Sequence, residues 1–183
     1  GLEQLAEGFY NDTYLMDQNA CSSPHLIVWL GERIELAKER FWSAIYSTVS
    51  EKYNLVEVNV VDKYTLLCKN AIEFNSISSF SNHSNFIYRI GMNELPDNTD
   101  ELRGKCGYFY EYDASDISNV AHIINPKYQT LTYFGVARSS LLDFVVKNRL
   151  PGIDRIVPVG RSLDIEVIWD GIDIVKRLSR IID

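Results

Sequence analysis

Short apolar runs alternate with helical patterns along this chain of 183 residues, and that alternation constrains the fold more than any other feature. The run from His25 to Leu30 predicts a buried strand, which Gly31 ends. Apolar residues then recur at helical spacing from Glu32 to about Lys52, and a second helix is expected from Val60 to Glu73. Because strands joined by helices of this length imply right-handed crossovers, we expect an α/β fold: a three-layer domain with a mainly parallel sheet and helices on both faces.

The alternation continues to the end of the chain. Further strands are predicted at Phe86–Ile90, Gly107–Tyr112, Thr130–Val136 and Ile153–Val157. Further helices are predicted from Asp113 or Ser115 to Ile124, from Ser139 to Leu150, and from the cap Asp170 onward, the last with Ile172, Val175, Leu178 and Ile182 facing inward. The polar stretch from Asn75 to Asn85 predicts a loop, and Thr13 to Asp17 is expected to be short and extended.

Composition places these elements in a single domain, residues 1–183, because a chain with 46% hydrophobic residues can bury one sizeable core. A net charge of -7, with no run of Lys or Arg, argues against a surface for nucleic acid or anionic lipid. There is neither a signal peptide nor an apolar run long enough to cross a bilayer. Three cysteines are an odd and sparse set that does not suggest a disulfide framework, so we expect a cytoplasmic protein.

One cysteine lies in a segment suited to chemistry, Asp17-Gln18-Asn19-Ala20-Cys21-Ser22-Ser23-Pro24. Small hydroxyl residues and a proline are typical of a tight turn that leads into a helix N-terminus, where free backbone N–H groups and the helix dipole favour a thiolate. Cys21 is therefore the candidate nucleophile. The alternative is an ordinary buried cysteine, because free Cys is among the most buried residue types.

Two stretches near the other end of the chain accompany this cysteine: Gly160-Arg161-Ser162-Leu163-Asp164 and Trp169-Asp170-Gly171. In this order the three segments resemble the C-terminal part of the bacterial long-chain acyl-CoA (fatty acyl) reductases, the family that supplies aldehyde in bioluminescence. That family in turn resembles the aldehyde dehydrogenases. The resemblance covers the whole chain and implies the fold of the aldehyde dehydrogenase catalytic domain, with Pro158-Val159-Gly160 close to the active site.

The resemblance also implies an activity, the NADPH-dependent reduction of a long-chain acyl thioester to a fatty aldehyde. Cys21 would attack the acyl carbonyl and carry the acyl group, and its own backbone N–H is a plausible donor to the oxyanion. The implied partners are long-chain acyl-CoA or an acyl-protein thioester, an acyl-protein synthetase and further copies of the chain. No metal is expected.

The cofactor contacts are expected to lie mostly outside these residues. The chain opens on Gly1-Leu2-Glu3-Gln4 without Met and holds no Gly-x-Gly-x-x-Gly loop, so we expect a fragment without its upstream cofactor-binding domain, incompetent for hydride transfer alone. By resemblance, Glu101 with Gly104 stands where aldehyde dehydrogenases place the Glu that holds the nicotinamide ribose. Arg103 replaces the expected aromatic residue. The alternative is a surface acid in a loop.

Two arginines flank the Gly160 stretch. Arg155 and Arg161 could meet a phosphate of CoA or NADPH, which would make Arg161 a second cofactor contact. The alternative for both is a salt bridge to Asp154 or Asp164.

Two other classes of function stay open. A cysteine hydrolase or acyltransferase would need a histidine and an acid that converge on Cys21, and it would turn over without nicotinamide. The chain has three dispersed histidines, His25, His83 and His122. If His25 begins a strand, it would point away from the thiol. A non-catalytic interaction domain would have Cys21 buried and unreactive. Cys68 lies in an apolar helical pattern and is expected in the core, and together with Cys106 it offers no metal-ligand spacing.

Overall fold

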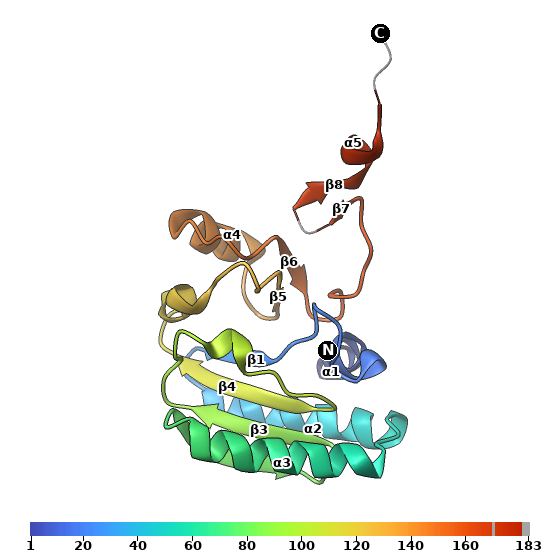
Figure 1. Ribbon diagram of the computed structural model, residues 1–183, viewed down its shortest axis with the longest axis vertical. Helices are drawn as coiled ribbons and strands as arrows, with labels where there is room; N and C mark the ends of the chain where they lie inside the picture. Colours follow the sequence, from blue (N-terminus) through green and yellow to red (C-terminus); the bar gives the residue numbers. More distant parts are fainter. Residues whose placement is uncertain (170, 181–183) are drawn as a thin grey trace.

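The computed structural model describes residues 1–169 and 171–180, and a four-stranded sheet lies in the lower half of the molecule as drawn in Figure 1. Its strands, in spatial order, are β1 (Leu26–Leu30), β4 (Tyr108–Ala114), β3 (Ile87–Met92) and β2 (Ile77–His83). β1, β4 and β3 run parallel, and β2 pairs antiparallel with β3 at one edge. The molecule is therefore a mixed α/β protein with a mostly parallel sheet, as the alternation predicts.

Helices flank this sheet. The helices are α1 (Leu2–Thr13), α2 (Ile34–Lys52), α3 (Glu57–Glu73), α4 (Arg138–Lys147) and α5 (Ile174–Leu178), with short 3-10 helices η1 (Tyr14–Met16), η2 (Thr99–Glu101) and η3 (Ile117–Ile123). Side chains alternate between the two faces along β4. Phe109 packs with Phe9 of α1 and Trp42 of α2 in one buried cluster. Tyr108 and Tyr110 belong to a second cluster with side chains of α3, η3 and α4. Both faces of the sheet are thus covered.

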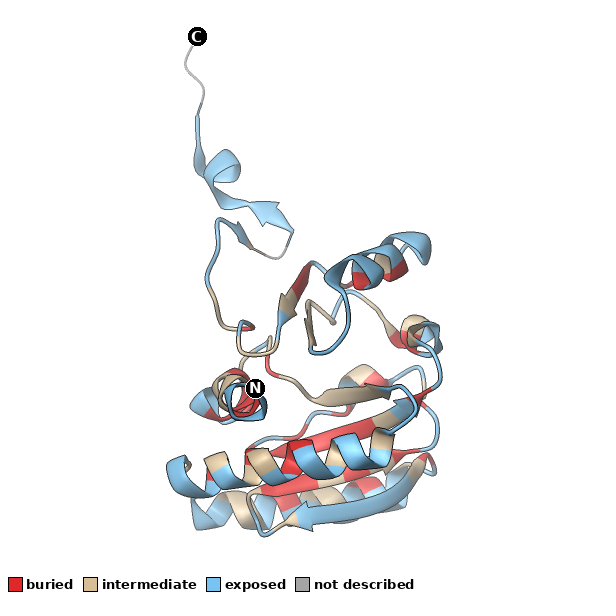
Figure 2. Ribbon diagram, turned by 180° about the vertical axis from the view of Figure 1, so that it is seen from behind, coloured by how far each residue is buried: buried red, intermediate tan, exposed pale blue. Residues whose placement is uncertain are grey.

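The C-terminal part forms smaller sheets of its own. β5 (Thr130–Tyr133) and β6 (Arg155–Pro158) are a separate parallel pair, and β7 (Ile168–Trp169) with β8 (Ile172–Asp173) forms a short antiparallel pair. The segment that carries β7, β8 and α5 extends away from the rest of the molecule (Figure 1), and Figure 2 shows it almost wholly exposed.

The inward face predicted for the last helix is therefore wrong. Ile172, Val175 and Leu178 are 52%, 60% and 81% exposed, because the segment leaves the body of the protein and reaches no core. The helix itself is short, and Asp173 caps it by accepting from the backbone N–H of Lys176. The predicted cap Asp170 and the predicted core residue Ile182 lie outside the described residues.

The other differences lie at polar or short elements. The predicted loop at residues 75–85 contains β2, an edge strand whose Ser and Asn side chains face solvent, so its composition resembles that of a loop. Residues 14–16 form the 3-10 helix η1 instead of an extended segment. η3 is also a 3-10 helix, capped by Asp116 instead of Asp113 or Ser115. α4 begins at Arg138, so Ser139 lies inside that helix and is not its cap.

Elsewhere the predicted elements are confirmed with small shifts. β1 and α2 occupy the predicted ranges, and α3 begins three residues before the predicted Val60. In the part of the chain that the structure describes, no helix combines the length and the apolar character needed to span a membrane.

Candidate functional site

Cys21 is exposed in a turn between η1 and β1. We call residues 17–24 the cysteine turn. The turn leads into β1 at Leu26, so the prediction that it feeds a helix N-terminus is wrong: the extended backbone of a strand follows, and no helix dipole points at the thiol from this segment. The alternative of an ordinary buried cysteine is also wrong for Cys21, because its neighbours hold the turn at the surface.

Gln18 fastens one side of the cysteine turn to the sheet. Its side chain is 1% exposed, and its amide nitrogen donates to the carbonyl oxygens of Pro24 at 2.8 Å and Tyr108 at 2.9 Å. Its amide oxygen accepts from the backbone N–H groups of Gly107 and Tyr108, both at 3.1 Å. Asp17 and Gln18 both have left-handed backbone conformations, with φ of 51° and 61°. Four hydrogen bonds, three of them buried, thus hold a backbone conformation that is uncommon for residues other than glycine.

Asp12 fastens the other side, through a segment far away in the sequence. We call residues 158–162 the signature loop. The Asp12 carboxylate accepts from the backbone N–H of Gly160 at 2.6 Å and of Ser162 at 2.9 Å. Its backbone oxygen accepts from the Ser23 hydroxyl at 3.1 Å. A Cβ on Gly160 would lie 2.8 Å from Cα of Gly8, so only glycine permits this close approach of the loop to α1. Asp12 therefore connects the signature loop to the cysteine turn.

Burial determines the electrostatics of this connection. The Asp12 side chain is almost fully enclosed, and desolvation raises the pKa of its carboxyl above the ordinary value. The hydrogen bonds from Gly160 and Ser162 lower that pKa and so oppose the effect of burial. The nearby charge of Asp164 raises it slightly.

A third segment reaches the cysteine turn through His25. Burial, and to a lesser extent the positive charge of Arg103, lower the pKa of His25 to about 4, while the nearby backbone of Gly104 opposes them. His25 is therefore a neutral side chain at pH 7 that lies close to Arg103 and Gly104, which follow η2 (Thr99–Glu101). Glu101 itself is exposed in η2, and its carboxylate accepts from the Asn98 amide at 3.4 Å. Among the described residues, no hydrogen bond or ion pair joins the two predicted site residues Cys21 and Glu101.

The arginines near the signature loop have structural partners. Arg155 is 7% exposed, and its guanidinium donates to the carbonyl oxygens of Ser162 at 3.0 Å and Asp164 at 2.9 Å. It also lies over the ring of Trp169, 4.6 Å from the centroid. Arg161 forms an ion pair with Asp164 and stays 60% exposed at its side chain. The salt bridge to Asp164, expected as the alternative for Arg161, is present.

The other two histidines, His83 and His122, contact residues outside the cysteine turn. A ring nitrogen of His122 lies 2.8 Å from the backbone oxygen of Leu95. His83 ends β2 beside Tyr46, with ring centroids 5.8 Å apart. Among the described residues, none of the hydrogen bonds joins a histidine to Cys21, so the pairing that a cysteine hydrolase requires is not formed there.

The two remaining cysteines differ in their exposure to solvent. Cys68 is exposed on α3, so the prediction that it belongs to the core is wrong: the inward positions of this helix are taken by Lys63 and Asn70. Cys106 is buried. Within residues 1–169 and 171–180, no group of three or more His, Cys, Asp or Glu side chains could hold a metal ion.

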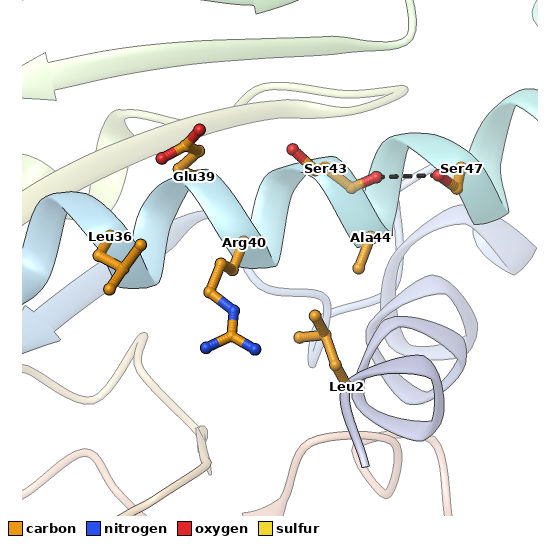
Figure 3. Close-up of a pocket in the computed structure, with 7 residues that line it drawn as sticks. All are labelled: Leu2, Leu36, Glu39, Arg40, Ser43, Ala44 and Ser47. Carbon is orange, nitrogen blue, oxygen red and sulfur yellow. Dashed lines mark hydrogen bonds between the residues drawn. The ribbon is translucent and has the colours of Figure 1, made fainter.

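Two hollows in the surface lie apart from the cysteine turn. The first, of about 440 Å³, is an open groove between Leu2 and the outer side of α2, where Figure 3 shows Arg40 and Glu39 pointing in different directions. The second, of about 430 Å³, lies beside β2 and contains Glu111. That carboxylate is already occupied, since it accepts from the indoles of Trp29 and Trp42 and from Arg89. Neither hollow gathers free polar groups around a candidate nucleophile.

Sequence reasoning missed Asp12 and Gln18. Asp12 continues the buried positions Leu5, Ala6 and Phe9 of α1 at helical spacing, and an acid at an inward position is a signal that could have identified it. Gln18 carries no comparable signal, because its role depends on the return of the chain at Gly107.

Neither a scan of protein-family models nor a search of the curated proteins finds a match to this chain. The resemblance to the reductase family therefore rests on the residues of the cysteine turn and of the two C-terminal stretches.

Proposed function

We propose that this chain is the acyl-accepting part of an NADPH-dependent long-chain acyl-CoA reductase, built on an aldehyde dehydrogenase-like catalytic domain. The observation that carries the proposal is the exposed thiol of Cys21 on a turn that is fixed on one side by the buried side chain of Gln18. On the other side, the Ser23 hydroxyl donates to the backbone oxygen of Asp12. A nucleophile held at the surface by rigid neighbours can meet a large thioester without reorganising.

The first chemical step concerns this chain alone. The Cys21 thiolate attacks the carbonyl carbon of the acyl thioester, and the backbone N–H of Cys21 donates to the oxyanion that develops. When the tetrahedral intermediate collapses, the carbon–sulfur bond to CoA breaks and CoA leaves as a thiolate. The acyl group is then joined to Cys21 as a new thioester, with no net oxidation or reduction.

The proposed cofactor contacts are Glu101 and Arg161. Both side chains are exposed. A carboxylate such as that of Glu101 can accept hydrogen bonds from ribose hydroxyls, and a guanidinium such as that of Arg161 can bind a phosphate. Because Arg161 is paired with Asp164, a phosphate would have to share or replace that carboxylate. When bound, NADPH supplies the hydride that reduces the acyl-cysteine to the aldehyde level.

The experiment is to incubate the chain with a long-chain acyl-CoA, without nicotinamide, and to weigh the protein by mass spectrometry. We expect one acyl group per chain, released by hydroxylamine as a thioester should be. The adduct should disappear in Cys21→Ser and persist in the matched variant Cys68→Ser, which removes another exposed thiol.

Two results would count against this proposal. An unmodified wild-type chain, or equal labelling of Cys21→Ser, would exclude Cys21 as the acyl acceptor. Steady release of free fatty acid without nicotinamide would favour the hydrolase class instead.

A further inference from the structure

α3 carries apolar side chains on the side that faces away from the sheet. Val58, Val61 and Ile72 are 58%, 63% and 83% exposed, and Cys68 is exposed between them. We call Val58, Val61, Thr65, Cys68 and Ile72 the outer stripe. Figure 1 shows α3 as the outermost layer on its side of the sheet. Single exposed apolar residues are ordinary on a protein surface, whereas several that recur along one side of a helix, here with Thr65 at the middle, mark a contact surface.

The orientation of α3 is fixed by polar contacts on its opposite side. Lys63 is 3% exposed, and its ammonium donates to the carbonyl oxygens of Asn85 and of Cys106, the latter at 2.8 Å. Asn70, also 3% exposed, donates to the hydroxyls of Tyr108 at 3.0 Å and Tyr110 at 2.6 Å. Turning the outer stripe inward would break these buried hydrogen bonds. The stripe is therefore a fixed feature of the surface.

The spacing of the stripe is that of a helix–helix seam. From Val58 onward its residues follow one another at alternating steps of three and four, as the numbers 58, 61, 65, 68 and 72 show. This is the repeat with which two helices pack side chains into each other along their length. The surface is thus shaped for another helix.

The charges beside the stripe identify that helix. Asp62 and Lys69 lie on the same flank of the stripe, because positions seven apart return to one side of a helix. If two copies of α3 pack antiparallel about a two-fold axis near Thr65, Asp62 of each copy faces Lys69 of the other. In the same arrangement Val58 faces Ile72, Thr65 faces its own copy at the axis, and Val61 lies beside Cys68 and Lys69 of the other helix. The face is self-complementary, as a symmetric dimer interface must be.

We infer that the outer stripe of α3 is a self-association surface, on which a second copy of this chain docks its own α3 in antiparallel orientation. The inference is independent of the proposed reductase activity. α3 has 17 residues, a length of about 25 Å, so the contact is at the small end of specific interfaces and the dimer is weak and concentration-dependent.

The first test is sedimentation of the chain over a range of concentrations. We expect a monomer–dimer equilibrium that Val61→Lys and Ile72→Lys abolish. Val146→Lys is the matched control, because Val146 is 67% exposed on α4 and lies outside the stripe. All three positions are exposed, so thermal unfolding should show each variant folded.

The second test uses the predicted charge pairs. Asp62→Lys and Lys69→Asp should each weaken the dimer several-fold, and the double variant should restore it, since the exchanged charges face each other again. Restoration would not occur if the two residues merely contributed to solubility.

Disulfide cross-linking tests the position of the two-fold axis in the proposed dimer. In a Cys21→Ser/Cys68→Ser background, Thr65→Cys should form a disulfide-linked dimer upon oxidation, because the axis passes close to residue 65. Ser50→Cys is the control: Ser50 is exposed on α2, and this variant should not form a disulfide-linked dimer. A chain that is monomeric at all concentrations, or a dimer that is unaffected by Val61→Lys and Ile72→Lys, would overturn the inference.

Discussion

At the scale of single residues, buried polar side chains determine where Cys21 lies. Gln18 satisfies its amide completely with backbone partners, and Asp12 binds two backbone N–H groups of the signature loop. Both residues lie within ten positions of the cysteine, yet most of their partners, at residues 107, 108, 160 and 162, are far away in the sequence. The nucleophile could be predicted from its local composition, whereas the residues that hold it could not, because their hydrogen bonds exist only after the chain has folded.

His25 gives a prediction for stability against pH. Its pKa is about 4 in the folded protein and about 6.5 in the unfolded chain, so between these values the unfolded chain binds more protons. The free energy of unfolding should therefore fall as the pH falls from about 6.5 to about 4, by at most about 3 kcal/mol from this residue. The measurement is urea unfolding at several pH values for the wild type and for His25→Gln. The difference between the two should depend on pH in this window, and a constant difference would refute the assignment.

At the scale of elements, a helix or strand can be predicted from the sequence when its apolar side chains are buried and its polar side chains are exposed. α2 is amphipathic and β1 is an uninterrupted apolar run, so both occupy their predicted ranges. β2 was missed because an edge strand exposes most of its side chains, and its Ser-rich sequence resembles that of a loop. In α3 the pattern locates the helix but not its orientation, since Lys63 and Asn70 are buried and the apolar stripe is outside.

The contact between α1 and the signature loop gives a prediction at this scale. Asp12→Ala would leave the buried backbone N–H groups of Gly160 and Ser162 without an acceptor, at a cost of about 2 to 4 kcal/mol of unfolding free energy. Hydrogen exchange should accelerate at these two amides, and alkylation of Cys21 should change. Asp164→Ala is the control, because it removes only a partly exposed ion pair and should cost about 1 kcal/mol or less. Unchanged exchange in Asp12→Ala would show that the carboxylate does not hold the loop.

At the scale of the whole molecule, the alternation of strands and helices predicts the class of fold but not how the chain divides into sheets. One sheet was expected, whereas β5 and β6 pair separately from the sheet that contains β1. Register and pairing depend on contacts between distant segments, which periodicity does not record. The C-terminal segment shows the same limit: its apolar residues predict a buried helix, but the folded chain exposes them.

The account as a whole depends on Cys21 as an acyl acceptor, and the rate at which each cysteine is alkylated tests it most directly. The measurement is peptide mass spectrometry of the folded chain at neutral pH, with and without a long-chain acyl-CoA, at a protein concentration too low for dimers. Cys68 is the exposed reference thiol, and Cys106 is the buried one. We predict that acyl-CoA slows the alkylation of Cys21 and leaves the rates of Cys68 and Cys106 unchanged. Equal rates at Cys21 and Cys68, both indifferent to acyl-CoA, would contradict the account.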